Sequence, residues 1–192
     1  MKITAMVAVA MTVAMSARAD EVTVYVQGFS VVPAPVLNRA QVLANEIFAG
    51  VGVKIDWRRG QPCRSQSRSE KPIVVEMITD TPRELKPRAL AFARPYEGVH
   101  ITLFYDRVGA ATEPQLTPNL LAHVLVHEIT HVLQGTCRHS DTGIMKARWA
   151  HTDYMEMGLK PLSFTEEDVQ LIRFGLAGRA NTGTLVATSE AR

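Results

Sequence analysis

Residues 117–135 read TPNLLAHVLVHEITHVLQG. Thr117 suits a helix N-cap, and Pro118 falls in the first turn, where its missing N–H is harmless. Gly135 can adopt the left-handed conformation that ends many helices. The stretch therefore predicts one long helix that ends at Gln134.

Two histidines, His127 and His131, lie four residues apart in this predicted helix. Side chains at that spacing leave the same face, so both imidazoles can bind one Zn²⁺ ion. Glu128 is not well placed to be a ligand, but its carboxylate can reach a water on the metal. Zinc lowers the pKa of such a water to about 7, and a carboxylate beside it can take the proton as the water attacks a carbonyl. A helix with two surface histidines has the same short pattern, so the context of the motif decides.

The third ligand is predicted from the segment after the helix. Gly135 breaks the helix one turn after His131, which lets the chain reverse and present His139 four residues later. Hydrolytic zinc sites use three protein ligands and leave one position open. We therefore predict His139 as the third ligand and one catalytic zinc ion as the cofactor.

The spacing of apolar residues predicts the other elements. A helix is expected over 35–50, and a last helix begins at 165–168 and runs to about Phe174. Residues 136–163 are expected to be irregular. Branched residues predict strands at 21–26, 53–57, 72–78, 89–93 and 99–105. The order of these strands and helices predicts an α+β fold with a five-stranded sheet, one long active-site helix and a small C-terminal part that ends in a helix.

The segment from His127 to Ser140, followed by Gly143-Ile144-Met145, resembles the metzincin zinc peptidases. That clan carries His-Glu-x-x-His-x-x-Gly-x-x-His and then a methionine turn beneath the metal. The pair His139-Ser140 and the methionine soon after it are most similar to the matrixins. The order of strands and helices resembles the clan from about residue 21 to 178, so the resemblance implies a metzincin-like fold with a mixed sheet.

The resemblance also assigns roles outside the helix. It implies that Met145 is the turn methionine, and Gly143 supplies backbone freedom just before it. An ordinary core methionine would have nearly the same sequence signature. The segment of Leu90, Ala91, Phe92 and Ala93 resembles the edge strand that lies along the matrixin substrate cleft.

The spacing of the third ligand departs from the clan pattern. His139 lies eight residues after His131, whereas the clan has six, and a count of six ends on Cys137. A thiolate is a good zinc ligand, but it donates more charge to the metal and is exposed to oxidation outside the cell. His139 remains the preferred ligand. Asp141 is an alternative, and so is Glu166, because a rival clan takes its third ligand from a glutamate on a later helix.

The N-terminus carries the pattern of an export signal. Lys2 precedes an apolar run from Ile3 to Met15, and Ala17-Arg18-Ala19 resembles a signal-peptidase site. The run is shorter than the ~20 residues needed to cross a bilayer. We predict a signal peptide at 1–19, a single metallopeptidase domain at 20–179, a flexible tail at 180–192, and a secreted or periplasmic location.

Cleavage after Ala19 would leave as many basic as acidic residues in the mature chain. A neutral chain gives no electrostatic reason to propose nucleic acid or a membrane as partner. Cys63 and Cys137 are the two cysteines, and in an oxidising compartment such a pair predicts a disulfide. Free thiols and metal ligation are the alternatives.

Two functions from different classes fit the sequence. The first is a secreted zinc-dependent endopeptidase, a hydrolase in which Glu128 is the general base and the strand at 89–94 pairs with an extended peptide or protein substrate. The second is a non-catalytic secreted binding module of the same fold. A binding module has no need of the Glu128 carboxylate, which favours the enzyme. The mature protein is expected to be a monomer.

Overall fold

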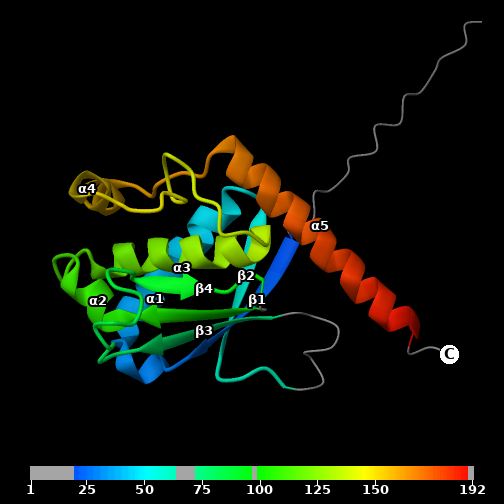
Figure 1. Cartoon of the computed structure of the whole chain (residues 1–192), viewed down its shortest axis with the longest axis horizontal. Coiled ribbons are helices and arrows are strands. Elements are labelled where there is room, and N and C mark those ends of the chain that lie inside the picture. Colours follow the sequence, from blue (N-terminus) through cyan, green and yellow to red (C-terminus); the bar gives the residue numbers. More distant parts are fainter. Residues whose placement is uncertain (1–19, 64–71, 97–98, 190–192) are drawn as a thin grey trace, which may run out of the picture.

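A mixed five-stranded sheet is the base of the computed structural model, which describes residues 20–63, 72–96 and 99–189 (Figure 1). The strand order is β2-β1-β3-β5-β4. The pairs β2–β1, β1–β3 and β3–β5 are parallel, and β4 runs antiparallel to β5 at one edge. The strands are β1 (Asp20–Gln27), β2 (Val53–Arg59), β3 (Ile73–Ile78), β4 (Ala91–Ala93) and β5 (His100–Phe104).

Helices cover one face of this sheet and extend beyond it. They are η1 (Phe29–Val31), α1 (Ala34–Ala49), α2 (Tyr105–Ala110), α3 (Thr117–Gln134), α4 (His151–Leu159) and α5 (Glu166–Ser189). Helices α1 and α3 pack against each other, α1 over β2 and α3 over β4. The predicted α+β class, the five strands and the long helix are therefore confirmed.

Helix α3 is buried along most of its length, because α1, α4, α5 and the sheet all pack against it. Its buried polar residues include His127, Glu128 and His131, each less than a tenth exposed. Gly135 has a φ of 66°, and its N–H bonds to the carbonyl of His131, as predicted for the helix end. The start differs by one residue, since Leu116 is the N-cap and Thr117 is already helical.

The C-terminal helix is longer than predicted. Helix α5 does not end near Phe174 but continues to Ser189, so most of the segment 180–192 that was predicted as a flexible tail is helical. The segment from Glu166 to Ser189 has no proline and several alanine and leucine residues, which are compatible with a helix. Ile172 and Leu176 are buried on the side of α5 that packs against α3.

Two short α-helices, as well as the 3-10 helix η1, were not predicted. Helix α2 follows β5 without a break, and α4 lies inside the stretch 136–163 that was expected to be irregular. The Asp153 carboxylate accepts the N–H of Ala150 at 2.6 Å and so caps the start of α4.

The predicted disulfide between Cys63 and Cys137 is not formed, and both thiols are free and exposed. Cys63 follows β2 at one edge of the sheet, whereas Cys137 lines a cavity beside β4 at the other edge. Four strand spacings separate the two edges by about 19 Å. A disulfide needs Cα atoms within about 7 Å, so the prediction was wrong for a geometric reason that the sequence did not contain.

Residues 1–19, the predicted signal peptide, lie outside the described part of the chain. Among the helices that the structure describes, none has the length and apolar character needed to span a membrane.

Candidate active site

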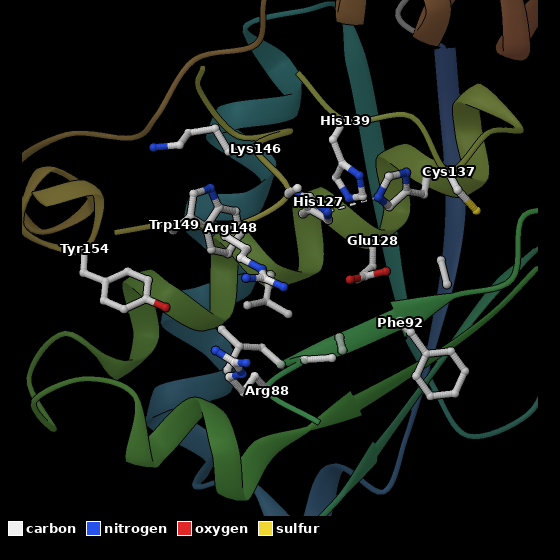
Figure 2. A pocket seen from close by; sticks show the side chains of 17 residues that line it. Arg88, Phe92, His127, Glu128, Cys137, His139, Lys146, Arg148, Trp149 and Tyr154 are labelled. Carbon is white, nitrogen blue, oxygen red and sulfur yellow. Dashed lines mark hydrogen bonds between the residues drawn. The ribbon is translucent and has the colours of Figure 1, made fainter. Parts of the chain in front are cut away.

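Three histidines form one cluster at the C-terminal half of α3 (Figure 2). His127 and His131 come from the helix, and His139 reaches back from the loop after it. One nitrogen from each ring lies within 4.8 Å of the others. In the described residues Cys137, Asp141 and Glu166 are not part of this cluster.

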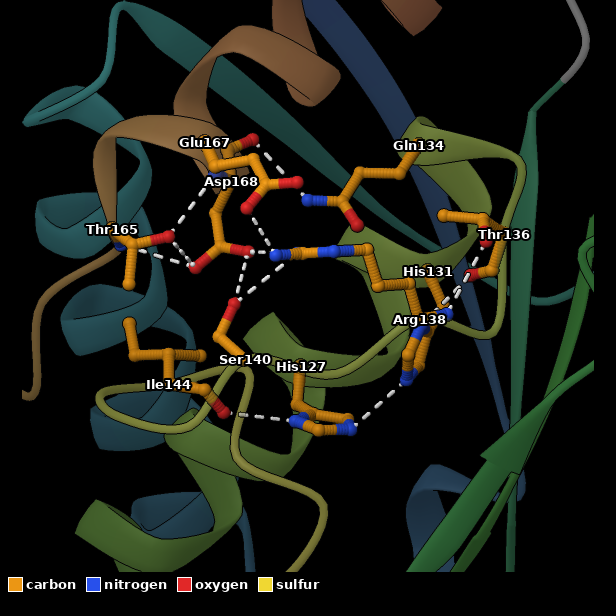
Figure 3. A network of polar contacts seen from close by, with 10 residues as sticks. All are labelled: His127, His131, Gln134, Thr136, Arg138, Ser140, Ile144, Thr165, Glu167 and Asp168. Carbon is orange, nitrogen blue, oxygen red and sulfur yellow. Dashed lines mark hydrogen bonds and ion pairs between the residues drawn. The ribbon is translucent and has the colours of Figure 1, made fainter.

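The ring nitrogens of the two helical histidines are arranged as two ligands of one cation would be. Their Nε2 atoms are 3.0 Å apart. Each Nδ1 lies against a backbone carbonyl, that of Ile144 at 2.8 Å for His127 and that of Thr136 at 2.9 Å for His131 (Figure 3). A carbonyl oxygen can only accept, so each Nδ1 carries the proton and each Nε2 presents a lone pair.

Both rings are neutral at physiological pH. Burial lowers the pKa of His127 to about 3 and the pKa of His131 to about 4, and repulsion from the other rings of the cluster adds to the effect. Two opposed lone pairs at this distance repel each other unless a cation lies between them. Two nitrogens on one tetrahedral zinc ion are about 3.3 Å apart, given Zn–N bonds of about 2.0–2.1 Å. The residues present therefore fit zinc, and the two carbonyls are the partners that hold such ligands in the required tautomer.

The loop that carries His139 is anchored to α5 by a polar network (Figure 3). Ser140, the next residue, donates its hydroxyl to the Asp168 carboxylate at 2.7 Å. Asp168 is fully buried and also accepts from the backbone and side chain of Thr165 and from Arg138. Burial raises the pKa of Asp168, but these hydrogen bonds and the Arg138 charge outweigh burial and hold it below its usual value.

We expect Asp168→Asn to lower the free energy of unfolding by about 2–4 kcal/mol at pH 7, because the amide cannot accept from all of these donors. The folded pKa is lowered, so the stabilisation is present above the unfolded pKa of about 3.9 and is lost as the pH falls through the folded pKa. Urea unfolding of wild type and variant at pH 7 and in acid measures this difference, which should shrink in acid.

Glu167→Gln is the matched control, since Glu167 pairs with the same Arg138 but is mostly exposed. It should cost less than about 1 kcal/mol. Equal losses for the two variants, or a loss for Asp168→Asn that is independent of pH, would contradict the role given to Asp168.

A backbone hydrogen bond closes the turn that follows His139, beside the histidine cluster. The N–H of Ser140 bonds to the carbonyl of Met145 at 2.8 Å, and Met145 is fully buried. Gly143 has a φ of 72°, and a Cβ at this position would lie 2.1 Å from the carbonyl oxygen of Ser163. Glycine is therefore required there, and the turn places Ile144 where its carbonyl can hold His127.

The carboxylate of Glu128 is buried between α3 and the edge strand. The backbone N–H of Ala93 donates to it. Burial raises the pKa of Glu128 to about 8, and the Ala93 hydrogen bond opposes this only in part. A divalent cation held by the histidines would also oppose it, by stabilising the ionised form.

A cavity of about 510 Å³ lies in front of the histidines and Glu128 (Figure 2). Leu90, Ala91, Phe92 and Ala93, the predicted edge strand, line one side of it. Within this segment, the carbonyl of Leu90 and the N–H of Arg94 bond to β5. By the alternation of an antiparallel pair, the backbone groups of Ala91 and Ala93 point the other way, into the cavity.

Several cavity residues were missed by sequence reasoning. The Trp149 ring packs edge-on against His127, with 5.4 Å between ring centroids, and its Nε1 donates to the carbonyl of Gly143. Tyr154 lines the cavity, as do Arg88 and Arg148. No pattern marks these residues, because they come from separate segments that only the fold brings together.

In the structure, an antiparallel edge strand thus lies beside a long helix with two histidines, and a third histidine returns from the loop after that helix. The structure is similar to the crystal structure of archaemetzincin from Methanopyrus kandleri, with a TM-score of 0.55. The two share 15% sequence identity, and the match covers 83% of this chain and 98% of that one. No family model and no curated protein matches the sequence. The comparison shows a common fold, and the finer resemblance to matrixins stays a prediction.

Proposed function

We propose that this protein is a secreted or periplasmic zinc-dependent endopeptidase. The observation that carries the proposal is the pair of bare Nε2 lone pairs on His127 and His131, with His139 beside them, at the wall of a cavity bordered by a free sheet edge. These three histidines would hold one zinc ion. When bound, zinc acts as a Lewis acid that acidifies water and polarises a carbonyl.

The edge strand supports an extended substrate. Ala91 directs its N–H and C=O into the cavity, so a peptide lying along β4 can pair with it as an added strand. The N–H of Ala93 is already used by Glu128. This contact places the carboxylate next to the point where the substrate backbone would pass.

Glu128 has the position of the general base. It takes a proton from the water that attacks the peptide carbonyl and returns it to the nitrogen that leaves when the C–N bond breaks. The buried side chain and the Ala93 N–H restrict its orientation. Its neighbours in the cavity include Trp149, whose ring packs edge-on against His127.

A digest of a mixed peptide library with the mature protein tests the proposal. We expect internal peptide bonds to be cut, cutting to stop when the zinc is chelated, and zinc to restore it. The alternative is a binding module of the same fold, which would bind zinc and peptides without turnover. A protein that carries zinc but leaves every peptide intact would establish that alternative.

A further inference from the structure

We propose that Arg88 and Arg148 bind a substrate carboxylate close to the scissile bond, so that the enzyme prefers acidic substrates; this inference rests on the proposed peptidase function. Both arginines line the cavity that contains Glu128 and the histidines. Figure 2 shows their guanidinium groups in the same part of the cavity, between Tyr154 and Glu128 in this view.

The charge of the cavity wall is strongly unbalanced. Its lining residues include three cations, Arg88, Lys146 and Arg148, and one carboxylate, that of Glu128. Lys146 is neutralised by Asp153 at 2.6 Å. Within the described residues, no carboxylate forms an ion pair with Arg88 or Arg148. Two such guanidinium groups beside a buried carboxylate leave a net positive wall that attracts a negative group.

The loop that carries Arg88 is held in place by a second arginine outside the cavity. The Arg107 guanidinium, on α2, donates to the carbonyls of Pro82, Leu85, Lys86 and Ala89 at 2.7–3.0 Å. Asp106 fixes the start of the same loop by accepting both the N–H and the hydroxyl of Thr81. Arg88 itself has a φ of 66°, an uncommon conformation for a side chain of this size. The loop therefore presents Arg88 from a fixed backbone.

The segment that carries Arg148 is also held on both sides of this residue. Two residues before it, Lys146 is tied to Asp153 of α4, and the next residue, Trp149, donates to Gly143. The two guanidinium groups thus come from two separate anchored segments that both line the cavity. Guanidinium binds carboxylates through paired N–H donors, so an aspartate or glutamate side chain, or the C-terminal carboxylate of a short peptide, has the required chemistry.

The test uses matched peptides that carry Glu, Gln or Lys at each position near the scissile bond, each with a free or an amidated C-terminus. We measure kcat/KM on the zinc enzyme, and the affinity of the same peptides for zinc-loaded Glu128→Gln by calorimetry. The Glu peptide should be preferred over Gln by about tenfold or more at one position, in both measurements.

Arg88→Gln and Arg148→Gln should each reduce this preference, and the double change to glutamate should shift it towards Lys. Arg83→Gln is the matched control, because Arg83 lies in the same loop but does not line the cavity; its selectivity should equal that of wild type. A preference that depends on the free C-terminus would identify the terminal carboxylate as the partner.

Equal use of Glu and Gln by wild type, or an unchanged preference in both arginine variants, would overturn the proposal. The binding measurement separates this failure from a failure of the proposed function. If wild type cuts nothing, the peptidase proposal fails, and the binding preference of the Glu peptides still decides the role of the arginines.

Discussion

Glu128→Gln should lower kcat by about 10²- to 10⁴-fold while the zinc content of the protein stays unchanged. Glutamine keeps the size of the side chain and can still contact the Ala93 backbone, but it cannot take the proton from water. The side chain is not among the three clustered histidines, so its change should not release the metal. Steady-state kinetics on a peptide substrate and metal analysis of the same samples measure the two effects together.

Glu84→Gln is a suitable control, since Glu84 is exposed in the loop before β4 and does not line the cavity. It should leave both kcat and zinc content at wild-type values. Near-normal turnover by Glu128→Gln would remove Glu128 from the mechanism, whereas loss of zinc in this variant would make it a ligand.

His139→Ala should weaken zinc binding by more than about 100-fold, because changes to the residues that merely orient metal ligands cost about 10- to 100-fold and this change removes a ligand. Cys137→Ser should bind zinc as wild type does. The structure places a His139 nitrogen with those of His127 and His131, whereas Cys137 lies outside that cluster and is exposed. Competition with a coloured chelator measures the affinities.

The two variants form a matched pair, since both residues lie in the loop between Gly135 and Ser140. The opposite pattern, with tight binding by His139→Ala and weak binding by Cys137→Ser, would make the thiolate the third ligand. The third ligand would then lie six residues after His131, and the site with three histidines would be wrong.

The elements that sequence analysis placed well are those with local signals. Gly135 marks the end of α3, and periodic apolar residues mark the strands and α1. The grouping of His127, Glu128 and His131 also results from local helix geometry. These features depend on neighbours in the sequence, so periodicity and spacing are enough to find them.

The features that were missed depend on contacts between distant segments. Helix α5 packs on α3 through Ile172 and Leu176, whereas its small, polar end carries no local signal for a helix. Asp168 holds the loop of His139 from a distance of many residues, and nothing around it in the sequence marks it as buried. The predicted disulfide was wrong because it was inferred from an oxidising compartment, and this inference contains no information about where the fold places Cys63 and Cys137.

X-ray absorption at the zinc edge of the purified mature protein tests the central claim most directly. It reports which atoms bind the zinc and at what distance, and metal analysis of the same sample gives the number of zinc ions per chain. We predict one zinc ion with only nitrogen and oxygen neighbours, at about 2.0–2.1 Å. A protein without bound zinc, or a sulfur neighbour at about 2.3 Å, would contradict the three-histidine site.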